Sequence, residues 1–166
     1  MSTPLILVNE LCTLIEHATQ DILLETKNGA FRAPVIIPGF FDEEDSGAGK
    51  PSLAEEIERS VPFVIVRFLS GEEQAQSGSA TIKIIAMTYA KQGQSWRDTM
   101  NILERIRQAI FRSRPLARQF NLQMPVKYEM PEDKPWPYFM AWMTTQWEIA
   151  RPLLTEMEEG MYGEYE

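Results

Sequence analysis

The clearest periodic pattern in the chain lies between residues 96 and 113. Apolar residues recur there at steps of three and four positions, at Met100, Leu103, Ile106 and Ile110. Polar and charged residues occupy the opposite side, so this spacing predicts an amphipathic helix with one buried face. Ser95 and Asp98 are placed as a capping pair at its start, and Pro115 ends it because proline has no N–H to continue the helix.

A second helical pattern occupies the N-terminal region, from about residue 4 to about residue 20. Its apolar positions keep a helical period, at Leu7, Leu11, Ala18 and Ile22. Thr3 is placed to cap the first turn, and Pro4 suits the first helical position, where a missing N–H costs nothing. Residues 52–59 have the composition of a short helical turn.

Four segments are rich in β-branched and aromatic residues and are predicted to be strands: 63–69, 80–90, 124–130 and 138–149. Residues 33–41, interrupted by prolines, suit an edge strand or an extended connector, and residues 70–79 suit an exposed hairpin tip. We therefore predict an α+β fold, with a mostly antiparallel sheet of four to five strands and two main helices packed on one face. Residues 1–154 are expected to form one domain with a mobile acidic loop near 42–60, followed by a disordered acidic tail at 155–166.

The predicted sheet is apolar on both faces. One face of the strand at 80–90 shows Ile82, Ile84 and Ala86. The other face is also apolar, and with the last strand it comprises Ile85, Met87, Tyr89, Tyr138, Met140 and Trp142. A sheet face in contact with water should be polar. Burial of apolar surface contributes about 25 cal/mol per Å², so leaving even three such side chains exposed loses several kcal/mol of folding free energy. Either the first 60 residues fold back over this face, or copies of the chain associate through it; we predict self-association.

Charge alternates along the chain, whose net charge is −8. Residues 1–60 contain 4 basic and 11 acidic residues, residues 61–118 contain 9 and 4, and residues 119–166 contain 3 and 9. These segments are either solvated faces or complementary patches that meet between neighbouring copies. The basic residues from 105 to 118 are a solvated face, or a contact for an acidic neighbour or for passing DNA phosphates. Arg105 and Arg112 therefore join the six apolar residues as the predicted oligomer interface.

No catalytic or metal-binding constellation is present in the sequence. His17 is the only histidine, so a Ser-His-Asp triad or a recognisable metal site is not predicted, and we expect no enzyme activity and no cofactor. Cys12 has no disulfide partner and suits a small core position. Residues 47–50 match only part of a phosphate-binding loop, because Glu44 and Pro51 break the motif. No signal peptide or membrane span is predicted, so a cytosolic protein is expected.

The order of the segments resembles the tail terminator proteins of long-tailed phages and prophages, also called tail completion or head–tail joining proteins. The resemblance covers residues 61–151: the strand Val61-Pro62-Phe63-Val64-Ile65-Val66-Arg67, a polar tip, the strand at 80–89, the helix at 96–113, and turns at 129–131 and 135–137 before an aromatic final strand. The acidic segment at 42–59 and the acidic tail have no match in this pattern.

This resemblance implies a non-enzymatic structural subunit of the virion tail, assembled in the host cytoplasm. Six copies would form a ring that caps the tail tube and joins it to the head–tail connector protein, while DNA passes through without specific binding. The partners would then be other copies, the tail tube protein and the connector, with no membrane. The hairpin tip supplies the predicted partner-contact loop, comprising Gly71, Glu72, Glu73 and Gln74.

Two other functions fit the sequence. One is another neck or head-completion component of the same particle. The other is a small-ligand-binding or enzymatic α+β domain in which the aromatic residues of the last strand line a pocket.

Overall fold

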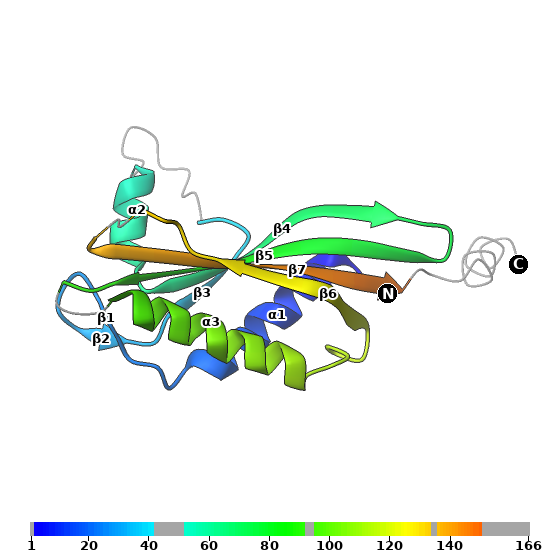
Figure 1. Ribbon diagram of the computed structural model, residues 1–166, viewed down its shortest axis with the longest axis horizontal. Helices are drawn as coiled ribbons and strands as arrows, with labels where there is room; N and C mark the ends of the chain where they lie inside the picture. Colours follow the sequence, from blue (N-terminus) through cyan, green and yellow to red (C-terminus); the bar gives the residue numbers. More distant parts are fainter. Residues whose placement is uncertain (1, 42–51, 92–94, 134–135, 151–166) are drawn as a thin grey trace, which may run out of the picture.

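A computed structural model describes residues 2–41, 52–91, 95–133 and 136–150 (Figure 1). The elements in chain order are α1 (Pro4–Thr19), β1 (Leu24–Glu25), β2 (Phe31–Arg32), β3 (Val35–Pro38), α2 (Leu53–Ser60), β4 (Phe63–Glu73), β5 (Ser77–Tyr89), α3 (Ser95–Arg112), β6 (Phe120–Glu129) and β7 (Tyr138–Ala150). Helices α1 and α3 lie together on one side of the main sheet, and α2 stands on the other side.

The main sheet has five strands in the order β3-β4-β5-β7-β6. Neighbouring strands are antiparallel, except that β3 pairs in parallel with β4. Strands β1 and β2 form a separate two-stranded ribbon. The predicted α+β fold is confirmed, including the edge strand expected within residues 33–41.

Both main helices follow the predicted patterns. In α1 the Thr3 hydroxyl accepts a hydrogen bond from the backbone N–H of Ile6 at 3.2 Å, so the expected cap is present. In α3 the residues with no exposed surface are Thr99, Ile102 and Ile106, and Leu103 and Ile110 are at most 3% exposed. The side chain of Ser95, predicted as a cap, lies outside the described part of the chain.

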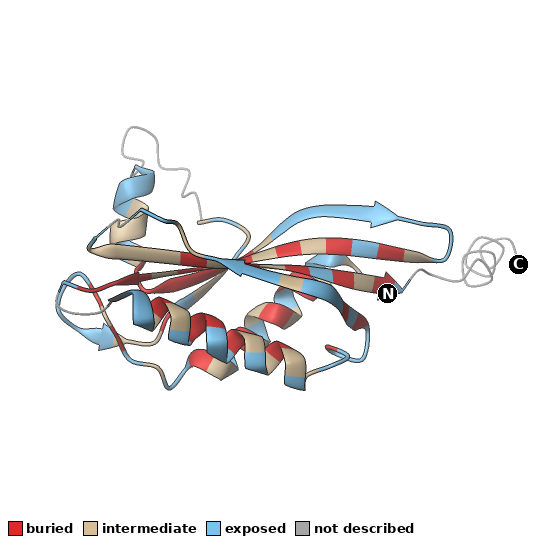
Figure 2. Cartoon of the chain, in the orientation of Figure 1, coloured by how far each residue is buried: buried red, intermediate tan, exposed pale blue. Residues whose placement is uncertain are grey.

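The main core fills the layer between the sheet and these two helices. Trp147 of β7 is fully buried there, and its Nε1–H donates to the Thr145 hydroxyl at 2.8 Å. That hydroxyl donates in turn to the carbonyl of Ile82 on β5 at 3.0 Å. Figure 2 shows the buried residues alternating along the strands and along the sheet-facing side of α3. These two hydrogen bonds join β7 to β5 inside the core and satisfy the polar atoms of Trp147 and Thr145.

Three predicted boundaries are wrong. Strands β4 and β5 extend through most of the expected 70–79 tip, leaving only residues 74–76 between them. Polar residues can form backbone hydrogen bonds between strands even though their side chains do not favour a strand. Strand β6 begins at Phe120 rather than at 124. Residues 53–60 form α2, capped by Ser52, within the region predicted as a mobile loop, whereas the helical turn predicted at 52–59 is confirmed. The remainder of that loop, and the tail, lie outside the described residues.

Candidate interaction surface

The face of the sheet that points away from α1 and α3, here called the second face, is apolar across its central strands. Its residues form three cross-strand pairs: Ile85 with Trp142, Met87 with Met140, and Tyr89 with Tyr138. The prediction that these six residues share one face is confirmed. Strand β4 widens the face, because Phe63 lies beside Met87 and Ile65 beside Ile85.

Helix α2 covers one end of the second face. Ile57 of α2 and Phe41 pack against a cluster whose buried members are Val61, Phe63, Ile65 and Tyr89. The Phe41 ring meets Phe63 edge-on, with 5.1 Å between ring centroids. Residues before 61 therefore cover the face in part, through Phe41 and α2, while α1 packs against the opposite face with α3.

The six residues differ in how far α2 and Phe41 cover them. Tyr89 is only 9% exposed, so it belongs to the cluster under α2 and not to an open surface. Its ring lies 5.4 Å from that of Tyr138, whose pKa is raised by burial. The other five are half-buried: Ile85, Met87 and Tyr138 pack against the cluster under α2, whereas Met140 and Trp142 do not belong to it.

The Trp142 indole is fixed at the open part of the second face. Its Nε1–H donates to Glu129 Oε2 on β6 at 3.0 Å, and Lys83 Nζ lies 4.7 Å from the ring centroid. Such a cation–π contact contributes about 0.5–1 kcal/mol at an exposed site. A ring held from two sides loses little freedom when another surface docks on it.

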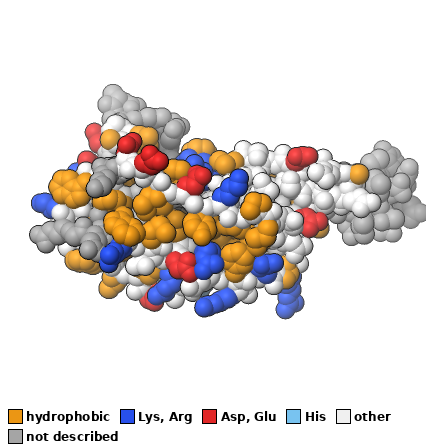
Figure 3. Space-filling model, in the orientation of Figure 1, with side chains coloured by type: hydrophobic (Ala, Val, Ile, Leu, Met, Phe, Trp, Pro, Cys, Tyr) orange, Lys and Arg blue, Asp and Glu red, His pale blue; other side chains and the backbone are white. Residues whose placement is uncertain are grey.

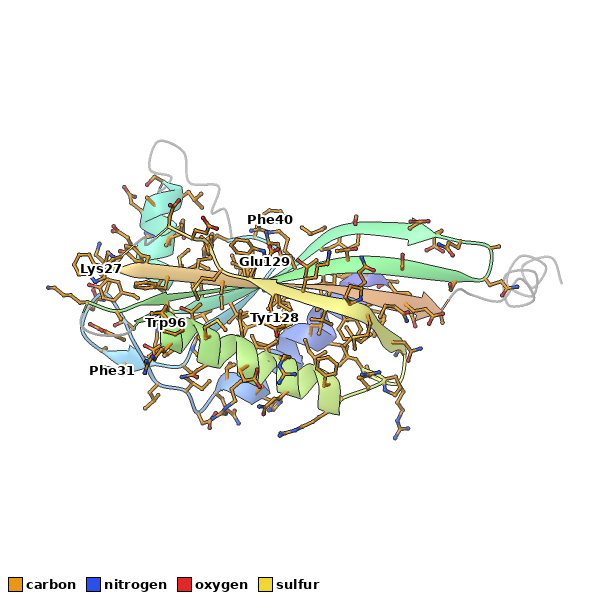
Figure 4. The ribbon with its side chains drawn as sticks, viewed as in Figure 1. Lys27, Phe31, Phe40, Trp96, Tyr128 and Glu129 are labelled. Atoms are coloured by element: carbon orange, nitrogen blue, oxygen red, sulfur yellow. The ribbon has the colours of Figure 1, made fainter. Side chains whose placement is uncertain are left out.

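Phe40 adds an exposed ring to the same side of the molecule. It is 67% exposed, and the Arg67 guanidinium carbon lies 4.3 Å from its centroid. Arg67 also donates from Nε to the carbonyl of Gly39 at 2.9 Å, which fixes the turn after β3. Figure 4 shows Phe40 and Glu129 on the same side of the sheet. Phe40 and Arg67 are distant along the chain, so no local sequence pattern predicts their contact.

The two predicted interface arginines lie elsewhere. Arg105 on α3 donates to the Asp21 carboxylate at 3.1 and 3.3 Å, and Arg112 donates to Gln108 Oε1 at 3.5 Å. Both line an open hollow between α1 and α3 that also contains His17. The predicted interface residues therefore belong to two separate surfaces, one on each side of the sheet.

The predicted partner-contact loop is largely a strand. Gly71, Glu72 and Glu73 belong to β4, and Gln74 begins the tip, where its N–H donates to the Ser77 carbonyl at 2.8 Å. All four residues are exposed. We call residues 68–73 the β4 arm, since every one of them is exposed and β3 does not extend alongside them (Figure 2).

Arg32 positions α2 and the start of β4. Its Nη1 donates to the carbonyls of Ala33 and Pro62 at 3.2 and 3.1 Å, and its Nη2 to those of Ser60 and Val61 at 2.7 and 2.9 Å. Partial burial lowers the pKa of this guanidinium. Arg32 thus satisfies carbonyls at the C-terminal end of α2 that have no partner within the helix.

The described residues form open hollows but no cluster of metal ligands. No three of their His, Cys, Asp and Glu side chains gather as metal ligands. A hollow beside Lys27 and Glu58 and the hollow beside His17 are both open, and neither is lined by an aromatic residue of β7. Within the described ranges, no helix is both long and apolar enough to span a membrane.

Comparison with known proteins adds no relative. No protein-family model matches the chain, and no curated protein is similar to it.

Proposed function

We propose that the chain is a non-enzymatic, ring-forming subunit of a long-tailed phage or prophage particle, which acts as the tail terminator. The second face is the observation that supports this proposal. Ile85, Met87, Met140 and Trp142 keep accessible apolar surface in the middle of a sheet face that α2 covers only at one end. Contact with another copy would remove that surface from water.

The proposed ring caps the tail tube and presents its other side to the head–tail connector. Six copies are expected from the resemblance of residues 61–151 to tail terminators. The protein would then act in the virion tail after assembly in the host cytoplasm, and DNA would pass through the ring without specific binding.

The first experiment measures the assembly state. The purified full chain, at micromolar concentration, is analysed by native mass spectrometry and by light scattering after gel filtration. We expect one closed oligomer with no small molecule bound. A strict monomer, or a monomer or dimer that is stabilised by a small ligand, contradicts the proposal and favours a binding domain.

A matched pair of variants tests the surface. Met140→Lys places a charge in the apolar centre of the second face and should shift the oligomer to monomers. Phe31→Lys changes a residue that is 65% exposed on β2 and should leave the oligomer intact. Equal effects of the two variants would show that the second face is not the contact.

The second experiment measures the function in the particle. In the phage or prophage that encodes the chain, loss of the protein should give tails of irregular length and heads without tails, as seen by electron microscopy. Loss of the protein with normal tails and normal joining would exclude a tail terminator, and normal tails that fail to join would favour another neck component.

A further inference from the structure

The main sheet has two open edges. On one side, β6 pairs with β7, and the first residue of its outer edge, Phe120, forms an isolated bridge with Leu116, so the open part of this edge begins after Phe120. On the other side, β3 pairs with β4 over residues 63–66 only. The strand partner of the β4 arm, residues 68–73, is β5. Open edges with free N–H and C=O groups are sites where another strand can add.

The two open edges lie at the same height along the strands. Cross-strand register runs from Ser70 to Thr81, from Thr81 to Gln146 and from Gln146 to Gln123. A second set of successive cross-strand partners crosses the four strands in the same way: Glu72, Ser79, Glu148 and Asn121. A rotation about an axis near the strand direction, without displacement along it, would bring Gln123 of one copy beside Ser70 of the next. Contacts related by pure rotation close into rings, whereas added displacement gives open filaments.

Strand direction fits the same arrangement. Strand β5 is antiparallel to both β4 and β7, and β6 is antiparallel to β7. Strand β6 therefore runs opposite to β4 within one copy. A neighbour in the same orientation would present its β4 arm antiparallel to β6.

The side chains of the two edges are complementary in charge. Residues 68–76 include Glu72 and Glu73 and no Lys or Arg. Residues 113–129, which reach the end of β6, include Arg114, Arg118 and Lys127 and one acidic residue, Glu129. An acidic arm thus meets a basic edge, and two arms or two β6 edges would repel each other.

Both edges also carry exposed apolar side chains. On the β4 arm, Phe68 is 42% exposed and Leu69 is 49% exposed. On β6, Met124 and Tyr128 are each 56% exposed. Figure 3 shows hydrophobic side chains gathered in a band across the face where β6 lies in front, with Lys and Arg below along α3. Exposed apolar residues on an open edge strand are unusual unless the edge is covered.

We propose that β6 of one copy pairs antiparallel with the β4 arm of the next, so that the main sheet continues from subunit to subunit. This inference rests on the proposed ring and names its strand contact. Phe120 is already bonded to Leu116 and Pro125 has no N–H, so the pairing runs over residues 121–124 of β6, roughly 13 Å at about 3.3 Å per residue.

Disulfide trapping in the full chain tests the pairing. The background variant Cys12→Ala removes the only cysteine, and Ser70→Cys and Gln123→Cys are then introduced together. Mild oxidation should link successive copies and give a ladder on non-reducing gels that ends at the subunit number of the ring. A control pair, Ser70→Cys with Asn28→Cys in an exposed turn, should give no ladder.

Three outcomes separate the two proposals. An oligomer that forms but gives no ladder overturns the strand pairing and leaves the ring. A dimer linked by Gln123→Cys alone shows two β6 edges together and also overturns the pairing. A background variant and wild-type chain that are both monomeric in native mass spectrometry overturn the proposed ring itself.

Charge variants at the same two positions give a second measure. Gln123→Lys combined with Ser70→Glu should assemble more tightly than Gln123→Lys combined with Ser70→Lys. An opposite-charge pair across two strands is favourable and a like-charge pair is not, so we expect the midpoint concentrations of dissociation to differ by about two- to tenfold per contact. Equal midpoints in dilution experiments by mass photometry would contradict the proposed register.

Discussion

Replacing Arg32 by methionine should lower the stability of the protein markedly. Methionine keeps much of the length and apolar stem of the side chain but removes all four hydrogen bonds to the carbonyls of residues 33, 60, 61 and 62. Those carbonyls are partly buried, so water can replace only some of the bonds. The variant is therefore destabilised because the end of α2 and the start of β4 lose their charged hydrogen-bond donor.

The magnitude follows from the four bonds. A hydrogen bond to a charged group contributes about 1.5–3 kcal/mol, and partial exposure of these carbonyls reduces the sum to about 2–4 kcal/mol. Burial of the charged guanidinium lowers its pKa and costs free energy, which offsets part of the gain from the hydrogen bonds. The methionine variant does not carry this cost. For a chain of this size, about 3 kcal/mol corresponds to a decrease in Tm of about 6–12 °C.

Urea denaturation followed by tryptophan fluorescence measures the free energy of unfolding. Arg59→Met is the matched control, because Arg59 is exposed on the neighbouring helix α2, and it should change stability by less than about 0.5 kcal/mol. Arg32→Lys should fall between the two, since a single ammonium cannot reach four carbonyls as a planar guanidinium does. An Arg32→Met variant within about 0.5 kcal/mol of wild type would refute this account of Arg32.

Three further predictions concern the core and two titrating groups. Trp147→Phe should cost about 2–4 kcal/mol in urea denaturation, because it leaves a void and removes the indole donor to Thr145; a cost below about 1 kcal/mol would contradict the packing described. Arg107 and Gln108 hold the pKa of Glu104 at about 2, below its usual 4.5, so the stabilisation by Glu104 is present above pH 4.5 and is lost as the pH falls towards 2. Glu104 is exposed, so Glu104→Gln should cost at most about 0.5 kcal/mol at pH 7 and nothing at pH 2, and an equal cost at both would be inconsistent with the ion pair. Burial and Glu16 raise the pKa of Cys12 to about 11, so alkylation by iodoacetamide should be slow at pH 8 and rise up to pH 11, whereas fast reaction at pH 8 would show an accessible thiolate.

The helices and the two faces of the sheet were predictable because their signals are local. The period of three and four residues in α1 and α3 fixes which side is buried, and the alternation along 80–90 and 138–149 fixes which residues share a face. Pairing of Met87 with Met140 follows once the strands align. These features need no knowledge of distant contacts.

The ends of the strands were not predictable in the same way. Ser70, Gly71 and Glu72 continue β4 although their side chains favour a loop, because the backbone ladder with β5 sets the strand length. The start of β6 has the same origin, since its residues from 120 to 123 pair with β7 before the irregular step between Gln123 and Lys127.

The interaction surface was predicted in part. Its apolar residues follow from the sequence, but their exposure depends on α2, which buries Tyr89 and leaves Met140 partly accessible. The contacts of Arg32 and of Arg67 join residues far apart in the chain, so no short sequence pattern predicts them. The separation of Arg105 and Arg112 from the second face likewise depends on which side of the sheet α3 packs.

The short length of β3 affects selectivity at its edge of the sheet. An extended peptide that approaches β4 from outside finds the stretch from Phe63 to Val66 already occupied, so it can bond only along the arm. Main-chain bonds alone would then be too few to hold an arbitrary sequence. The four-residue strand β3 thus confines strand addition at this edge to the β4 arm.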